Sequence, residues 1–399
     1  MNKNQSRIHI LEDEKISWVL VAPCIVLTAQ YFFLLINDLL GIINSLTIQT
    51  ASKVLVAIMF IYVMPVALKR RKVTFICTYL IATAILLSHF VLFPDNEPYI
   101  IGILFLFFFM CLPAFVYSLS LNDWDVFRKI LRKAGLIVFI FGTASGVLVL
   151  IGLANIGDYS MALSYYMLLP AIIYLDKLMD QPAFIPTVGT LVSLFIILAL
   201  GSRGAIICII TFVVLKIIRP HSTMNFKRVF FYTMTICIGI LSIFNLNQIF
   251  IFIYNFFIGF GIRSRTLELF LIDINHLSGR DHIYQNIVGE ILDSPILGIG
   301  IGGDRRVNGE DGLYAHNFFL EVFSNFGLFF GSLILFILIL LILNILFAKD
   351  KGKYNMAIIW ISLGFVHLMV SGSYLTDINF WIFTGLITNY CFGSKNRNN

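Results

Sequence analysis

Two long stretches of this chain, residues 229–262 and 322–348, contain no charged side chain. A helix crosses the hydrocarbon core of a membrane with about 20 apolar residues. The whole chain of 399 residues is 59% hydrophobic and 13% charged. Soluble domains carry about 25% charged residues. One aqueous core cannot bury this much apolar surface. We therefore predict an all-α polytopic membrane protein, since helices satisfy their own backbone in lipid.

Apolar runs predict about twelve transmembrane helices, in a single integral membrane domain over residues 1–399. The first run lacks a small-residue cleavage site and is too long for the apolar core of a signal peptide, so we expect a first span there. The expected spans are residues 16–36, 51–68, 73–93, 98–121, 134–154, 159–179, 184–201, 204–218, 229–250, 322–347, 355–374 and 378–393.

Basic residues set the expected orientation. Clusters at 69–72, 128–133, 216–228 and 349–353 each follow an even-numbered span, and both termini are basic. Basic loops stay in the cytoplasm, so we predict cytoplasmic N- and C-termini. The net charge of +6 then reports orientation, and no nucleic-acid partner is expected. Lys216 belongs to the third cluster and is expected at this cytoplasmic face.

One long external loop, residues 259–313, remains between spans 9 and 10. Its basic residues are all arginine, whose planar fork binds phosphate or carboxylate bidentately where lysine does not. We expect the loop to form a lid of short amphipathic helices on the membrane surface. The five arginines are Arg263, Arg265, Arg280, Arg305 and Arg306.

Within this loop, residues 281–293 have a helical pattern that ends before Pro295. Its apolar face is expected to contain Ile283, Ile287, Val288, Ile291 and Leu292. Arg280 precedes this helix and Asp281 opens it. Their structural interpretations are a solvated loop charge for Arg280 and an N-cap for Asp281.

A glycine-rich turn follows this helix. Gly298, Gly300 and Gly303 formally match GxGxxG, but no strand–helix unit surrounds them, so a dinucleotide site is rejected. We expect a glycine turn whose amides face an anion.

Arg203 stands alone among apolar residues in the sequence GSRG, between Gly201 and Gly204. We expect the tip of a hairpin between spans 7 and 8 at the external face, where glycines permit a sharp turn and close approach of another group. An arginine at this depth is costly unless it faces water, protein or an anion. The alternative is an interfacial arginine that reaches lipid phosphates.

His316 and Asn317 lie where the loop enters span 10, in YAHNFFLE. We expect the helix to start at the Asp311–Gly312 turn, which would place His316 in its first turns. A helix N-terminus disfavours imidazolium, so the ring should be neutral near pH 7. A neutral imidazole can accept a proton or orient a hydroxyl. The alternative is a satisfied interfacial histidine.

Other motifs have structural interpretations. The six cysteines lie in apolar runs without a CxxC pair, which indicates small buried hydrophobic side chains and not a metal site or disulfides. The DWD at 123–125 resembles a metal-binding DxD, but its place in a basic cytoplasmic loop favours a helix start. No metal and no cofactor is expected.

The order GSRGA, SGRDHIYQNIVGEILDSPILGIGIGG, YAHNFFLE and GSYLTDINFWIFTGL resembles the superfamily of O-antigen ligases and Wzy-type polymerases. The similarity covers the chain from residue 184 to its end. It implies transfer of glycan from an undecaprenyl-diphosphate carrier to an acceptor hydroxyl at the outer face of the cytoplasmic membrane, without nucleotide sugar or metal. O-antigen, capsule and exopolysaccharide synthesis all use such transfers.

The resemblance also implies roles for single residues. Arg203 and Arg280 would hold the diphosphate and stabilise its developing charge, and His316 would act on the acceptor hydroxyl. Arg305 and Arg306 are further substrate-binding candidates, and Asn317 would hold the imidazole or contact sugar. Expected partners are undecaprenyl-diphosphate-linked glycans, membrane lipids and a chain-length regulator or flippase of the same pathway.

Three activities stay open at this point. A polymerase adds the growing glycan to a new lipid-linked repeat unit, and we favour it because the chain matches only the motifs that the superfamily shares. A ligase transfers finished glycan to a lipid A core or another surface acceptor. A lipid flippase is the alternative from another class, although flippases carry charges inside several spans. Here only Asp38 and Asp176 come near that description.

Overall fold

The computed structural model describes residues 3–41, 44–151, 153, 161–200, 202–219, 229, 232–234, 246–259, 280–309 and 313–393. In these residues every regular element is a helix and no strand occurs. Six segments of the described chain are long and apolar enough to cross a membrane: Arg7–Leu40, Ser45–Leu92, Pro94–Ser120, Trp124–Leu150, Met161–Asp180 and Phe318–Leu346. The architecture is therefore that of an all-helical membrane protein.

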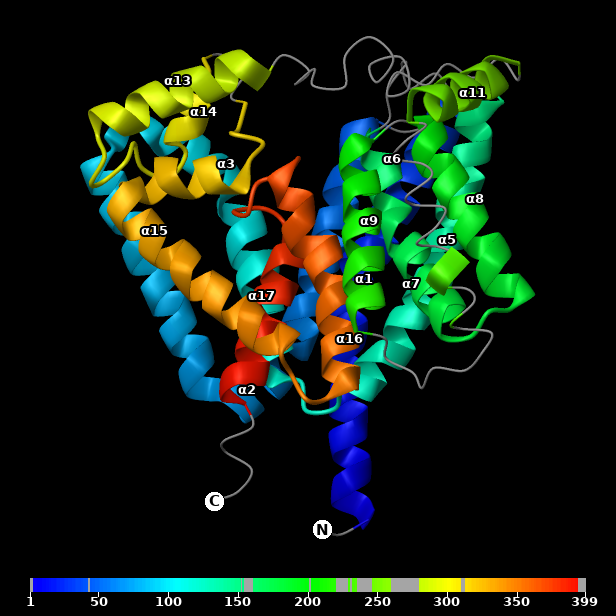
Figure 1. The fold of residues 1–399 in the computed structure, drawn as a ribbon. Helices are drawn as coiled ribbons and strands as arrows, with labels where there is room; N and C mark the ends of the chain where they lie inside the picture. The colour runs from blue at the N-terminus through cyan, green and yellow to red at the C-terminus, as the bar shows by residue number, and fades with distance from the viewer. Residues whose placement is uncertain are drawn as a thin grey trace. The chain divides into compact units, whose positions relative to one another are not determined.

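Figure 1 shows the helices in chain order. They are α1 (Lys3–Leu40), α2 (Ser45–Leu92), η1 (Pro94–Asn96), α3 (Glu97–Leu106), η2 (Phe107–Cys111), α4 (Leu112–Ser120), α5 (Trp124–Leu150), α6 (Met161–Tyr166), α7 (Leu168–Asp180), α8 (Phe184–Leu200), α9 (Arg203–Ile218), α11 (Leu246–Gly259), α13 (Arg280–Asp293), α14 (Gly303–Val307), α15 (Phe318–Leu346), α16 (Lys351–Trp360), η3 (Ile361–Phe365), η4 (Val366–Met369) and α17 (Ile378–Phe392).

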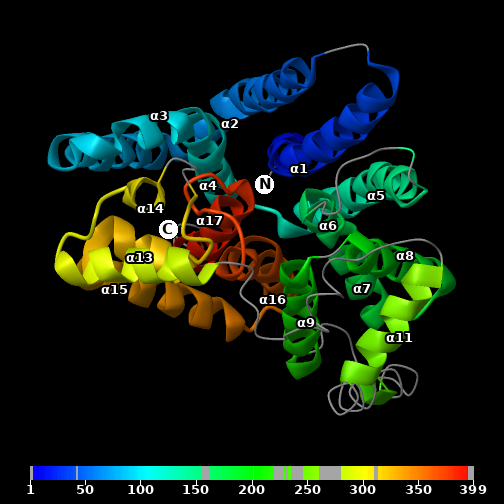
Figure 2. The ribbon, with the colours of Figure 1, turned by 90° about the horizontal axis from the view of Figure 1, so that it is seen from above.

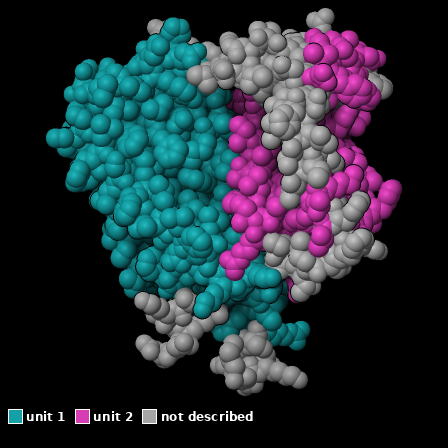
Figure 3. All heavy atoms as spheres, viewed as in Figure 1, with its two compact units in different colours: residues 1–20, 57–127, 277–399 teal, residues 21–56, 128–276 magenta. Residues whose placement is uncertain are grey.

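The chain divides into two compact units (Figure 3). Unit 1 contains residues 1–20, 57–127 and 277–399, and unit 2 contains residues 21–56 and 128–276. The expected span 229–250 lies largely outside the described residues, as do Gly201, Arg263, Arg265, Asp311 and Gly312.

In unit 1, α2 is interrupted at Arg71, whose φ of −142° and ψ of 46° are not helical. The interruption falls between the expected spans 51–68 and 73–93, and the later segment runs from the bottom of Figure 1 to its upper left. Beside it, Arg70 pairs with Asp13 at 2.6 Å and Glu12 at 3.0 Å, and it donates to the carbonyl of Ser120. These contacts fix α1, α2 and the end of α4 to one another.

A second interruption divides α15, which the uninterrupted apolar run did not predict. Gly327 has a φ of +72°, a conformation that glycine adopts at little cost. A regular helix would bond the amide of Leu328 to the carbonyl of Ser324. Here the Leu328 amide donates to Pro295 at 2.7 Å and the Ser324 carbonyl accepts from Ile299 at 2.7 Å. The loop before α14 thus satisfies both groups that the interruption exposes.

Helix α13 confirms the predicted amphipathic helix and lies across α15 in the view from above (Figure 2). Ile287 and Ile291 are buried and Ile283 packs beside them against α15. Of the other residues expected on this apolar face, Val288 and Leu292 are 40% and 65% exposed in the protein. Helix α13 also contacts α14.

In unit 2, α7 packs along α8, and Gly189 of α8 lies against the ring of Tyr174. Lys216 of α9 is fully buried and pairs with Asp176 at 2.7 Å and Asp180 at 3.1 Å on α7. Lys216 is therefore part of a buried ion-pair cluster, and it is not a solvated member of a basic loop.

Candidate active site

Unit 1 brings together residues from four separate parts of the sequence. Arg280 opens α13, Arg305 lies on α14, His316 and Asn317 precede α15, and the segment 370–374 connects η4 to α17. In Figure 1, α13 and α14 lie at the top, above the first turns of α15. Three of the predicted site residues, Arg280, Arg305 and His316, interact electrostatically within this cluster.

The backbone of His316 is held in an unusual conformation. Its φ is +50°, and it is the sole non-glycine residue with positive φ in the described chain. On one side, the amide of Ala315 donates to Asp304 Oδ2 at 2.9 Å. On the other side, Asn317 Oδ1 accepts from the amides of Phe319 and Leu320 and caps α15.

The predicted helix start at Asp311–Gly312 is wrong, because α15 begins at Phe318 and His316 lies outside it. The Asn317 side chain caps the helix, which favours a start at Phe318 over a start earlier in the chain. Asn317 is thus a capping residue in the structure.

The His316 ring is nevertheless neutral near pH 7. Burial, together with the smaller effect of the charges of Arg280 and Arg305, lowers its pKa from 6.5 to about 4. The cause is desolvation and neighbouring charge and not the helix N-terminus. Its Nδ1 atom is buried and has no hydrogen-bond partner among the described residues. The Tyr314 ring lies against it, with centroids 4.0 Å apart.

Arg280 is half-buried at the start of α13, so it is not a solvated loop charge. Its Nη1 donates to the backbone carbonyl of Val370. Among the described residues, this bond to a neutral carbonyl is the one hydrogen bond that Arg280 makes. Most of its guanidinium donors are therefore available to an anion. Asp281 lies inside the helix and is not its N-cap.

Arg305 is held by two buried carboxylates. Its Nη1 pairs with Asp304 Oδ1 at 3.2 Å and its Nη2 lies 3.8 Å from Glu321 Oε1. Asp304 and Glu321 are 0% and 1% exposed. Nη2 also donates to Ser373 Oγ at 3.0 Å, and Ser373 donates to Glu321. Burial raises the pKa of Asp304, and the charge of Arg305 opposes this rise.

Of the other two predicted arginines, Arg306 makes separate contacts in unit 1 and Arg203 belongs to unit 2. Arg306 donates through Nε to Asn96 Oδ1 at 2.9 Å, and Asn96 donates to the carbonyl of Ile299 at 2.8 Å. Arg203 is the first residue of α9 in unit 2, directly after the N-cap Ser202. The structure therefore groups Arg280, Arg305, His316 and Asn317.

Four amides of the glycine turn donate within the protein and are therefore not available to an anion. The amides of Gly298, Ile299, Ile301 and Gly303 all donate within the protein, to backbone carbonyls or, for Ile301, to the His89 ring. A Cβ added at Gly298 would lie 2.6 Å from the backbone nitrogen of Gly327. The glycines thus allow the loop to approach the interruption in α15.

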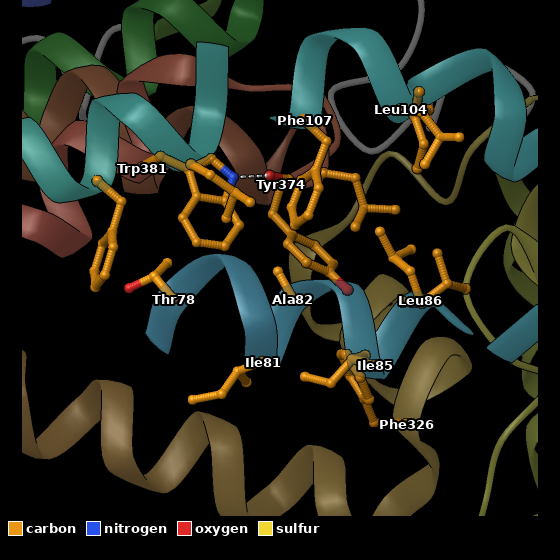
Figure 4. Close-up of a pocket in the computed structure, with 15 residues that line it drawn as sticks. Thr78, Ile81, Ala82, Ile85, Leu86, Leu104, Phe107, Phe326, Tyr374 and Trp381 are labelled. Carbon is orange, nitrogen blue, oxygen red and sulfur yellow. Dashed lines mark hydrogen bonds between the residues drawn. The ribbon is translucent and has the colours of Figure 1, made fainter. Parts of the chain in front are cut away.

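An apolar cavity of about 300 Å³ lies within unit 1 (Figure 4). Tyr374 stands in its centre and connects it to the polar cluster, since its amide donates to Glu321 Oε2 at 3.1 Å and its hydroxyl accepts from Asn325 at 2.7 Å. Trp381 closes one side and donates to the carbonyl of Tyr374 at 2.7 Å. The wall is otherwise formed by Thr78, Ile81, Ala82, Ile85, Leu86, Ile103, Leu104, Phe107, Leu112, Phe115, Ile301, Phe326 and Leu375.

The carboxylates of this cluster were not predicted. Asp304 stands directly before the two arginines, and Glu321 precedes the apolar run that starts at residue 322. An acidic residue at the edge of a membrane span is costly and indicates a functional or paired group, so Glu321 carried a usable signal. Ser373 and Tyr314 carried none, because hydroxyl residues are common in such loops.

Other expectations concern single motifs. Asp123 Oδ1 accepts from the amides of Asp125 and Val126 at the start of α5, which confirms the helix-start interpretation of DWD. Among the described cysteines, Cys111 and Cys208 are buried, whereas Cys77 is exposed. Among the described residues no group of histidine, cysteine and acidic side chains could hold a metal. No protein-family model, curated protein or solved structure matches this chain.

Proposed function

We propose that this protein is a membrane glycosyltransferase that moves a growing glycan from a lipid diphosphate carrier to an acceptor hydroxyl. The observation that carries the proposal is the neutral His316 ring, whose buried Nδ1 has no hydrogen-bond partner among the described residues and which the charges of two arginines influence. A neutral imidazole accepts a hydroxyl proton, and the neighbouring cations suit an anionic leaving group.

The reaction assigns a task to each group. The bond between the anomeric carbon and the phosphate oxygen breaks, a bond from that carbon to the acceptor oxygen forms, and the hydroxyl proton passes to His316. Arg280 binds the diphosphate with the donors that Val370 leaves available. Arg203 is a second diphosphate ligand by motif, and Arg306 is a peripheral substrate contact. Asn317 acts by capping α15 and so fixes the residue after His316.

Arg305 contributes charge more than direct binding. Arg305 is 8% exposed, and its guanidinium already has Asp304 and Ser373 as partners. Its positive charge still reaches His316, whose pKa it lowers. We therefore propose that Arg305 keeps the imidazole neutral and that Arg280 makes the principal phosphate contact.

The apolar cavity supports a lipid-linked substrate. Its wall is almost entirely hydrocarbon and aromatic, and Tyr374 belongs both to that wall and to the polar cluster. A substrate with a diphosphate attached to a hydrocarbon chain presents both chemistries in the same order. A water-soluble nucleotide sugar would leave this cavity without an occupant.

The topology that suits this function has twelve spans, cytoplasmic termini and an external loop 259–313 in a bacterial inner membrane. The six long apolar helices support the membrane location. The orientation rests on the basic clusters of the sequence.

Lipid-linked glycans from a deletion strain would identify the step. Single repeat units on the carrier are expected if the protein is a polymerase. Long glycan chains left on the carrier would instead indicate a ligase, and absence of external repeat units would indicate a flippase.

Purified protein in lipid with a synthetic lipid diphosphate repeat unit, without metal or nucleotide, tests the chemistry. Wild type should build a ladder of products, and His316→Ala should lose about 10²–10⁴-fold in rate while it still binds the carrier. Arg203→Lys keeps the charge but loses the bidentate fork, so its product yield should fall at normal membrane abundance. Equal ladders from wild type and His316→Ala would refute the proposed mechanism.

A further inference from the structure

The two oxygens of Asp304 serve two different parts of the candidate site. Oδ2 accepts the amide of Ala315 at 2.9 Å, and Oδ1 accepts from Arg305 at 3.2 Å. The side chain is 0% exposed. Neither oxygen faces a substrate, so Asp304 can affect chemistry only through the groups that it holds.

The first of these groups is the backbone that carries His316. A left-handed residue other than glycine is uncommon, and this conformation costs about 1–2 kcal/mol per residue. Such a conformation persists only where the surroundings determine it. The bond from Ala315 to Asp304 fixes the residue before His316, and the Asn317 cap fixes the residue after it. Loss of the first bond would let the backbone relax and turn the imidazole.

The second group is the segment that docks Arg280. Arg305 joins Asp304 to Ser373. In the same segment, Gly372 donates to the Tyr314 hydroxyl at 3.2 Å and Val370 accepts from Arg280. One buried carboxylate thus connects the backbone beside His316 and the segment that holds Arg280 through separate sets of hydrogen bonds.

We propose that Asp304 is a positioning residue that holds His316 in its left-handed conformation through the amide of Ala315. Its role rests on the proposed transfer reaction, in which His316 accepts the acceptor proton. The anchor acts on the geometry of catalysis and not on affinity for the carrier lipid.

Two variants with the same charge isolate the hydrogen bond. Asp304→Asn and Asp304→Ala both remove the negative charge and leave Arg305 with Glu321 as a single counter-ion, so both retain a balanced cluster. Only Asn keeps an oxygen that can accept from Ala315. We expect Asp304→Ala to lower kcat by about 10²-fold, the effect of a misplacement of about 1 Å, with KM for the lipid diphosphate donor little changed. Asp304→Asn should recover most of kcat.

A matched control separates positioning from loss of stability. Asn389 is also a polar anchor in unit 1, where its side chain donates to the carbonyls of Ser118, Leu119 and Leu121 at the far end of α17. Asn389→Ala should lower the amount of folded protein and leave kcat per folded molecule unchanged. Equal kcat losses in the Asn and Ala variants of Asp304 would overturn the proposal.

A measurement without turnover distinguishes this proposal from the proposed function. Acylation of His316 by diethyl pyrocarbonate, read by mass spectrometry with exposed His9 as the internal reference, reports the environment of the ring directly. The rate should change in Asp304→Ala and stay near wild type in Asp304→Asn. An unchanged rate in Asp304→Ala would overturn the positioning role, whereas a wild type without transferase activity would overturn only the proposed reaction.

Discussion

Removal of Arg305 should destabilise the protein in a strongly pH-dependent way. Arg305→Met leaves Asp304, which is 0% exposed, without the cation that it pairs with. Loss of one partner from a buried ion pair costs about 3–5 kcal/mol. The Asp304 carboxyl can escape this cost only by protonation. At pH 7, protonation of one carboxyl with an ordinary pKa near 4 costs about 4 kcal/mol, since each pH unit is worth about 1.4 kcal/mol.

The sign of the pH effect follows from linkage. In the variant, the folded-state pKa of Asp304 rises further above the unfolded value, because Arg305 no longer opposes the effect of burial, so the folded protein binds more protons than the unfolded chain. The penalty is therefore absent below about pH 4 and grows as pH rises. At about pH 5 it should be near 1.4 kcal/mol, against about 4 kcal/mol at pH 7.

The assay is the free energy of unfolding in mixed micelles titrated with SDS, at both pH values. Arg306→Met is the matched control on the same short helix, because Arg306 bonds the neutral amide Asn96. Loss of that bond should cost about 1 kcal/mol at either pH. Equal destabilisation by the two variants, or the same Arg305→Met penalty at both pH values, would refute the ion-pair reasoning.

Three further predictions concern separate features. Because the pKa of His316 is lowered to about 4, kcat/KM should not lose activity through this group until pH falls towards 4; an inflection near 6.5 would contradict its burial. Gly298→Ala should lower the free energy of unfolding by about 2–4 kcal/mol, because this residue has a positive φ and the added Cβ would meet the main chain. Gly309→Ala should cost only about 1 kcal/mol, because Gly309 also has a positive φ but has open space around it. In a cysteine-free background, cysteine at Asn308 should label from outside and cysteine at Lys351 only after permeabilisation; labelling of both from one side would refute the topology.

The positions of helices followed from the sequence, and their interruptions did not. Apolar runs and basic clusters located most described helices, because hydrocarbon demands long apolar helices whatever their neighbours. Helix α15 is broken at Gly327, within a stretch of sequence that contains no charged side chain. The break is stable because residues of the preceding loop, Pro295 and Ile299, satisfy the exposed amide and carbonyl. A hydrogen bond between segments that are distant in the sequence produces no periodic pattern in either segment, so the pattern of residues does not predict it.

The candidate site divides in the same way between local and distant causes. The neutrality of His316 was predicted from a helix N-terminus, yet burial and two arginines produce it. Arg305 was predicted as a phosphate ligand from its residue type, but Asp304 and Glu321 occupy its guanidinium. Residue type gives the charge of a side chain, whereas its partners come from packing between segments. Arg280 has a neutral carbonyl and no carboxylate among its described partners, which is why we propose this arginine, and not Arg305, for the phosphate contact.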